Sequence, residues 1–141
     1  MLPQSPEQAG YYTYGTPGNG AGQYAHPSLI SMLCQVERRW NQIDKRKFGV
    51  GNISKHGGVP YPGHLSHRKG TEVDIRLLRK DGKEDRVTRF NEEYDRDATK
   101  KLIELFWETG VVKVILFNDA SIPKVKPWFN HDDHLHVSIS V

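Results

Sequence analysis

The sequence predicts an α+β fold in which a small, mostly antiparallel sheet carries about two helices on one face. Three observations support this fold class. Two stretches carry apolar residues at helical spacing, and several short segments alternate in polarity or are rich in β-branched residues. Turns rich in glycine and proline separate these segments. With 141 residues, the chain has the length of one domain.

The first 27 residues are expected to be an irregular leader without helix or strand. Glycine and proline are frequent there, and Glu7 is the only residue among Asp, Glu, Lys and Arg. Two interpretations of its tyrosines stay open: they belong to a flexible arm, or they pack onto the domain and line a groove. Residues 28–141 are expected to form a single domain.

A first helix is expected directly after Pro27, a residue suited to a helix start. Its apolar face would consist of residues at helical spacing: Leu29, Ile30, Leu33, Val36, Trp40 and Ile43. Residues 49–54 read as a short extended piece, and residues 57–63 must be a loop because of their glycines and prolines.

The rest of the chain predicts more strands and a second helix. In order, the expected elements are a strand over 73–78, a hairpin-type turn at Asp81-Gly82, a returning strand over 86–90, a helix from Asp95 to Gly110, a central strand over 111–117, a loop over 118–130 and a final strand over 134–141.

Composition excludes several classes of protein. No apolar stretch approaches the roughly 20 residues of a membrane span, and no signal peptide is visible at the start. The single Cys34 excludes an intramolecular disulfide and a cysteine-based zinc finger. The net charge of +3 permits an anionic partner, but the basic residues are mixed with acidic ones, so we expect no nucleic-acid binding.

Histidines near the C-terminus suggest a reactive centre. In the final strand, side chains alternate between two faces, so Leu135 would point into the core and His134 and His136 would share the other face. Both imidazoles can then reach one centre. Either both bind a metal ion, or one binds it and the other works beside it.

Asp74 and His67 extend this pattern. Asp74 begins a strand between the apolar residues Val73 and Ile75, where a carboxylate is costly to bury unless it is paired or bound to a cation. Imidazole and carboxylate ligands suit tetrahedral zinc. Three protein ligands would leave a fourth position for water, which is typical of a catalytic site.

Two segments of the chain carry a family resemblance. Residues 57–74, which end in HLSHRKGTEVD, and residues 131–137, HDDHLHV, resemble the signature segments of penicillin-insensitive murein endopeptidases. That family is similar to a wider group of lysostaphin-type peptidases, D-Ala-D-Ala metallopeptidases and hedgehog domains. The resemblance implies a fold of the hedgehog and D,D-peptidase kind.

The resemblance also implies roles for single residues. It places one zinc ion per chain on His67, Asp74 and His136. His134 would be the general base, and His131 a further active-site histidine. The implied reaction is the hydrolysis of D-Ala–diaminopimelate cross-links in peptidoglycan, in the periplasm or cell wall. Because no serine is acylated, β-lactams should not inhibit it.

Two supporting residues carry less specific signals. His64 matches the first histidine of the family's HxxH segment and would support a ligand or contact the substrate. Asp133, with Asp132 beside it, would orient a neighbouring histidine, or would only be a solvated loop residue.

Other functions stay open at this point. A D,D- or L,D-carboxypeptidase acting on muropeptide stems would use the same centre, and a zinc module as in hedgehog domains would keep the ligands without hydrolysis. The chain could be a mature domain of a longer protein, or be delivered by a phage lysis system or a secretion machine with a separate immunity partner. The oligomeric state is open.

Overall fold

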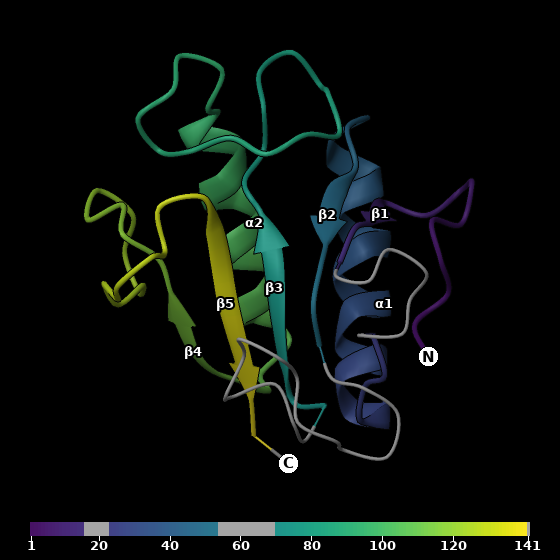
Figure 1. The fold of residues 1–141 in the computed structure, drawn as a ribbon. Helices are drawn as coiled ribbons and strands as arrows, with labels where there is room; N and C mark the ends of the chain where they lie inside the picture. Colours follow the sequence, from purple (N-terminus) through teal and green to yellow (C-terminus); the bar gives the residue numbers. More distant parts are fainter. Residues whose placement is uncertain (16–22, 54–69, 141) are drawn as a thin grey trace.

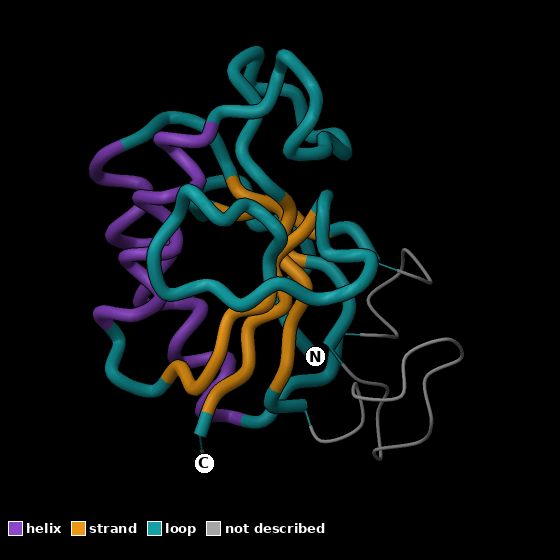
Figure 2. Tube along the Cα trace, turned by 90° about the vertical axis from the view of Figure 1, so that its left-hand side faces the viewer, coloured by secondary structure: helices purple, strands orange, loops and turns teal. Residues whose placement is uncertain are grey.

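A five-stranded sheet organises the computed structural model, which describes residues 1–15, 23–53 and 70–140. The strand order is β1-β2-β3-β5-β4, with only the β1–β2 pair parallel. The strands are β1 (Tyr11–Thr13), β2 (Phe48–Val50), β3 (Glu72–Arg76), β4 (Val112–Leu116) and β5 (His134–Ile139). Two helices, α1 (Pro27–Ile43) and α2 (Arg96–Glu108), cover one face of the sheet (Figures 1 and 2). The predicted α+β class is confirmed.

Both helices begin and end where local chemistry dictates. The side chain of His26 accepts a hydrogen bond from the backbone of Ser28, and Pro27 follows it at the helix start. The Asp95 carboxylate caps α2 by accepting from the backbone of Ala98 at 3.0 Å. Gly110, with φ of +77°, takes the left-handed conformation that ends α2.

The core lies between the helices and the sheet. On α1 the buried residues follow the 3.6-residue period: Leu29, Met32, Leu33, Val36 and Trp40. They join one cluster with the inward residues of the two inner strands β3 and β5, namely Val73, Ile75, Leu135 and Val137, all fully buried. The opposite face of these strands carries polar residues, and neither α1 nor α2 lies on it (Figure 2).

Three expectations from the sequence need correction. The leader contains the strand β1, whose Tyr11 and Tyr12 are buried against the domain. The segment 86–90 does not form a strand. The backbone N–H of Asn91 donates to the carbonyl of Thr88 in a turn, and the backbone N–H of Arg89 donates to the carbonyl of Asp132. The strand β4 lies at the edge of the sheet instead of its centre, because it pairs with β5 alone among the named strands, and on its outer side it bonds only the backbone of Lys126. The division of the chain at residue 27 stays a prediction.

No helix in the described part of the chain is long and apolar enough to cross a membrane.

A buried carboxylate anchors the long loop after β4. Asp119, 4% exposed, accepts hydrogen bonds from Tyr94 at 2.8 Å, Arg96 at 2.7 Å and Ser121 at 2.6 Å. Burial alone would raise the pKa of Asp119, but these donors lower it from 3.8 to about 2. Asp119 therefore ties the start of the loop to the α2 side of the domain.

Asp119→Asn should lower the free energy of unfolding at pH 7 by roughly 1–2 kcal/mol, because it removes the charge that accepts four hydrogen bonds from Tyr94, Arg96 and Ser121. The pKa of Asp119 is lower in the folded protein than in the unfolded chain, so its contribution is complete above about pH 4 and declines toward pH 2. Urea unfolding across this range measures the difference from wild type, with the exposed Glu92→Gln as the control. A difference that stays constant down to pH 2 would contradict this assignment.

Candidate active site

The pairing of β3 with β5 builds the polar face of the sheet. Directly opposite residues across these strands are Glu72 and Ser138, Asp74 and His136, and Arg76 and His134. The intervening pairs, Val73–Val137 and Ile75–Leu135, belong to the core. Because side chains alternate between faces, one register places all six polar residues on the side of the sheet away from α1 and α2.

Asp74 and His136 lie at the centre of this face. Asp74 is 8% and His136 is 7% exposed, and Asp74 Oδ1 lies 3.3 Å from His136 Nδ1. On its other nitrogen, His136 Nε2 lies 3.6 Å from Glu72 Oε1. Burial lowers the pKa of His136. The hydrogen bonds and charges of Asp74 and Glu72 more than offset this effect and raise the pKa from 6.5 to about 9. The two carboxylates therefore favour positive charge at this point.

His134 stands beside this pair and is oriented by its neighbour in sequence. Its Nδ1 lies 2.6 Å from Asp133 Oδ1, and its Nε2 lies 3.8 Å from Asp74 Oδ1. Arg86 Nε donates to the second oxygen of Asp133 at 2.5 Å. The hydrogen bond with His134 is the main cause of a pKa of about 2 for Asp133. Asp133 is thus ionised, holds the Nδ1–H of His134 and turns Nε2 toward Asp74.

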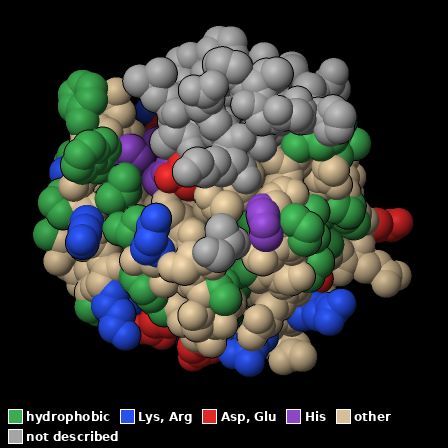
Figure 3. Space-filling view, turned by 90° about the horizontal axis from the view of Figure 1, so that it is seen from below, with side chains coloured by type: hydrophobic (Ala, Val, Ile, Leu, Met, Phe, Trp, Pro, Cys, Tyr) green, Lys and Arg blue, Asp and Glu red, His purple; other side chains and the backbone are tan. Residues whose placement is uncertain are grey.

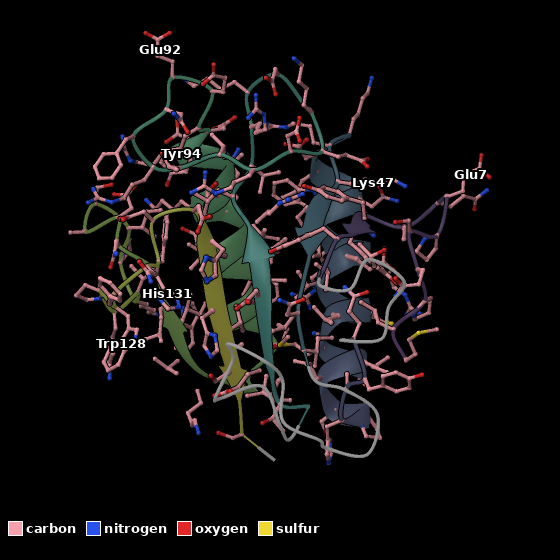
Figure 4. All side chains as sticks on the ribbon, viewed as in Figure 1. Glu7, Lys47, Glu92, Tyr94, Trp128 and His131 are labelled. Atoms are coloured by element: carbon pink, nitrogen blue, oxygen red, sulfur yellow. The ribbon has the colours of Figure 1, made fainter. Side chains whose placement is uncertain are left out.

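His131 completes the group of imidazoles from the end of the long loop. Its ring centroid lies 4.6 Å from that of His134 and 5.8 Å from that of His136. Its Nδ1 lies 2.7 Å from the carbonyl oxygen of Phe129, and burial, as the largest cause, lowers its pKa. The neutral ring therefore donates through Nδ1 and presents Nε2 to its surroundings. Figure 4 shows His131 next to Trp128, beside β4 and β5.

The loop that carries His131 is fixed by polar side chains. Asn118 Oδ1 accepts from the backbone of Trp128 at 2.8 Å, and the backbone N–H of Asn118 donates to the carbonyl of His131 at 3.0 Å. Asp132 accepts from Arg89 Nε at 2.8 Å and from Asn118 Nδ2 at 3.2 Å. Of the two adjacent aspartates, only the Asp133 side chain bonds a histidine within the described residues. In the space-filling view, histidine and acidic side chains meet at the surface beside a hydrophobic patch (Figure 3).

Two of the predicted residues cannot be placed. His67 and His64 lie within 54–69, outside the described residues. Among residues 1–15, 23–53 and 70–140, no group of three or more His, Cys, Asp or Glu side chains could hold a metal ion. The described part of the site therefore contributes Asp74 and His136 as a pair of candidate ligands, with His131, His134 and Asp133 around them.

Sequence reasoning missed three residues of this face. A cavity of about 150 Å³ beside Asp74 and His134 is also lined by Tyr14, Arg76 and Arg86. Arg76 has a signal in the sequence, because it follows Asp74 by two residues and must share its face of the strand. Tyr14 and Arg86 come from distant parts of the chain, and no local pattern points to them.

Comparison of the sequence with known protein families gives one match. The profile of the family described as "Penicillin-insensitive murein endopeptidase" matches residues 18–115. The chain belongs to this family of peptidases, which confirms the resemblance seen in the sequence.

Curated relatives carry the same description at modest identity. Proteins named "Penicillin-insensitive murein endopeptidase" from Escherichia coli O6:K15:H31 (strain 536), O9:H4 (strain HS) and O1:K1 are 25%, 23% and 24% identical to the chain. In each case the match covers 82% of this chain and 53% of the relative. The chain thus spans about half the length of the curated relatives it matches.

The hydrogen bonds of the two loop-side imidazoles predict their tautomers. Neutral His131 and His134 should both carry the proton on Nδ1, because Phe129 O and Asp133 Oδ1 accept it. Two-bond ¹H–¹⁵N spectra at neutral pH distinguish the tautomers. In Asp133→Asn the Nδ1–H form of His134 should lose population while that of His131 stays unchanged, which makes His131 the internal control. A wild-type His134 protonated on Nε2 would contradict the geometry.

Proposed function

We propose that this chain is a zinc-dependent D,D-endopeptidase that hydrolyses D-Ala–diaminopimelate cross-links in peptidoglycan and is insensitive to β-lactams. Family membership supports the general class of murein endopeptidase. One observation of the structure carries the chemistry: a buried carboxylate and imidazole, Asp74 and His136, face each other with an oriented imidazole, His134, beside them.

The donor pair fits zinc. Two ligands of a tetrahedral zinc ion, each about 2.0–2.1 Å from it, stand about 3.3 Å apart. The distance from Asp74 Oδ1 to His136 Nδ1 is 3.3 Å. Imidazole and carboxylate are ordinary zinc ligands, and both side chains are held by adjacent strands of one sheet. In this proposal His67 supplies the third ligand.

When bound, zinc supplies a Lewis acid that makes water more acidic and polarises the carbonyl of the scissile amide. The protein moves the proton. His134 Nε2 accepts it from the attacking water and delivers it to the leaving amine, so the imidazole carries positive charge between these events. Asp133, held ionised by His134 and Arg86, stabilises that charge.

His131 is proposed to hold the substrate. Its Nδ1–H is engaged by Phe129, so Nε2 is the nitrogen available to the substrate. The neutral ring accepts a hydrogen bond there, and the protonated ring donates one to a developing oxyanion. The aligned side chains of Asp133, His134 and His131 favour an enzyme over a zinc module without activity, which would not need an oriented base.

Because the proposed substrate is peptidoglycan, the enzyme would act where peptidoglycan is found. The proposed enzyme acts in the periplasm or cell wall on peptide cross-links, and the route of export and a delivery or immunity protein stay open. A carboxypeptidase is the main competing activity. It would release D-Ala from monomeric muropeptides, whereas the proposed endopeptidase converts dimeric muropeptides to monomers.

Purified protein should solubilise cross-linked Gram-negative sacculi. We expect a strong chelator to abolish release and a zinc supplement to restore it, whereas penicillin should have no effect because no serine is acylated. Chromatography of the muropeptides reports the products. Full activity after complete metal removal, or inhibition by penicillin, would disprove the mechanism.

Variants should separate metal binding from proton transfer. His136→Ala and Asp74→Asn should lose bound zinc in elemental analysis, because each removes a ligand. His134→Ala should retain about one zinc per chain but lose roughly 10²–10⁴-fold in kcat, the usual contribution of a general base. Arg39→Gln, which breaks an exposed ion pair with Glu108, is the control for the loss of a charge elsewhere on the protein. A His134→Ala protein with wild-type turnover would remove the assigned role of that histidine.

A further inference from the structure

The cavity beside Asp74 and His134 has the size and polarity for a small charged group. Its volume is about 150 Å³, and its lining consists of polar side chains: Tyr14, Asp74, Arg76, Arg86, Asp133 and His134. One water molecule needs roughly 10–15 Å³ of such space, so the cavity has room for several waters. A carboxylate with its adjoining carbon atom fits the same space.

The two arginines of the cavity have different partners: Arg86 is paired with a carboxylate, whereas Arg76 lies against tyrosine side chains. Asp133 accepts from His134 through one oxygen and from Arg86 through the other. The Arg76 guanidinium instead lies over the ring of Tyr14, 3.9 Å from its centroid. Within residues 1–15, 23–53 and 70–140, Arg76 has no ion pair with a carboxylate.

The ring under Arg76 is held by the adjoining strands. The backbone N–H of Tyr14 donates to the carbonyl of Val50 at 3.0 Å. Gly51 makes room for the ring, because a Cβ at this position would overlap the outer ring atoms of Tyr14. Strand β3 fixes the other end of the stack, since it carries Arg76. The guanidinium is therefore presented by a built support and not by a free surface side chain.

The register of the sheet relates this cation to the proposed reaction. Arg76 stands directly opposite His134 across β3 and β5. His134 is the residue proposed to protonate the leaving amine. A substrate group that reaches Arg76 is therefore attached on the amine side of the scissile amide.

We propose that Arg76, stacked on Tyr14, binds the carboxylate on the carbon next to the scissile nitrogen, and so selects substrates whose leaving amino acid carries it. This inference rests on the proposed function and specifies its substrate. In a D-Ala–diaminopimelate cross-link the carbon bonded to the scissile nitrogen bears a carboxylate, whereas in a cross-link to the lysine side chain it bears only hydrogens. A guanidinium recognises a carboxylate through two parallel N–H donors.

Two dimeric muropeptides test this selection. They differ only at the carboxylate next to the scissile nitrogen, which is free in one and converted to a carboxamide in the other. Wild type should cleave the free acid about 10- to 100-fold better in kcat/KM, the usual effect of a hydrogen-bonded charge. Equal cleavage of both dimers would overturn the inference and leave the proposed hydrolysis intact.

Variants test whether residues of this cavity cause the preference for the free acid over the carboxamide. Arg76→Gln should lose the preference because its kcat/KM falls more on the acid than on the carboxamide, and Arg76→Lys should restore part of the preference. Gly51→Ala, which displaces Tyr14, should weaken the preference without removing any charge. Arg39→Gln, the matched loss of a distant charge, should keep it. An Arg76→Gln protein that is folded by circular dichroism and retains the full preference would overturn the inference.

Binding gives a readout that is independent of turnover. Tetrapeptide stems with diaminopimelate or lysine at the third position, titrated in NMR experiments, should differ in affinity, with the diaminopimelate stem bound about tenfold more tightly. The difference should vanish in Arg76→Gln. A preference in binding without any hydrolysis would refute the proposed function but support this inference, and equal binding of both stems would refute the inference.

Discussion

The antiparallel pairing of β3 with β5 is the constraint on which the site depends. It places Asp74 opposite His136 and Arg76 opposite His134, while Val73 and Ile75 enter the core with Val137 and Leu135. A slip of one residue would move the whole polar set into the core and the apolar set into water. The hydrophobic core therefore fixes the relative position of the groups that carry the proposed chemistry.

The remaining parts of the site are added to this pair of strands by other segments. The loop after β4, anchored through Asp119 and Asn118, brings His131 to within 4.6 Å of His134 between ring centroids. The N-terminal segment adds Tyr14, and the loop after β3 adds Arg86. The sheet thus supplies the centre of the site, and loops from three regions supply its surroundings.

Much of this arrangement could be predicted from the sequence, because strong periodicity reports burial. The two helices follow from apolar residues at 3.6-residue spacing, and the shared face of His134 and His136 follows from alternation in β5. Weak local signals explain the errors. Tyr11–Thr13 is too short to show a pattern, and the segment 86–90 has strand-like composition but forms tertiary contacts to Asp132 instead of a ladder. Tyr14 reaches Arg76 only through tertiary contact, which no local pattern encodes.

X-ray absorption of the zinc-loaded protein reports the atoms around the ion and so tests whether these side chains bind it. We expect one zinc per chain with only nitrogen and oxygen neighbours at about 2.0–2.1 Å, including imidazole, and no such spectrum from His136→Ala, which should lose the metal. A sulfur neighbour at about 2.3 Å, which only the single Cys34 or a methionine could provide, would contradict this site. So would a His136→Ala protein that keeps one zinc per chain with an unchanged spectrum.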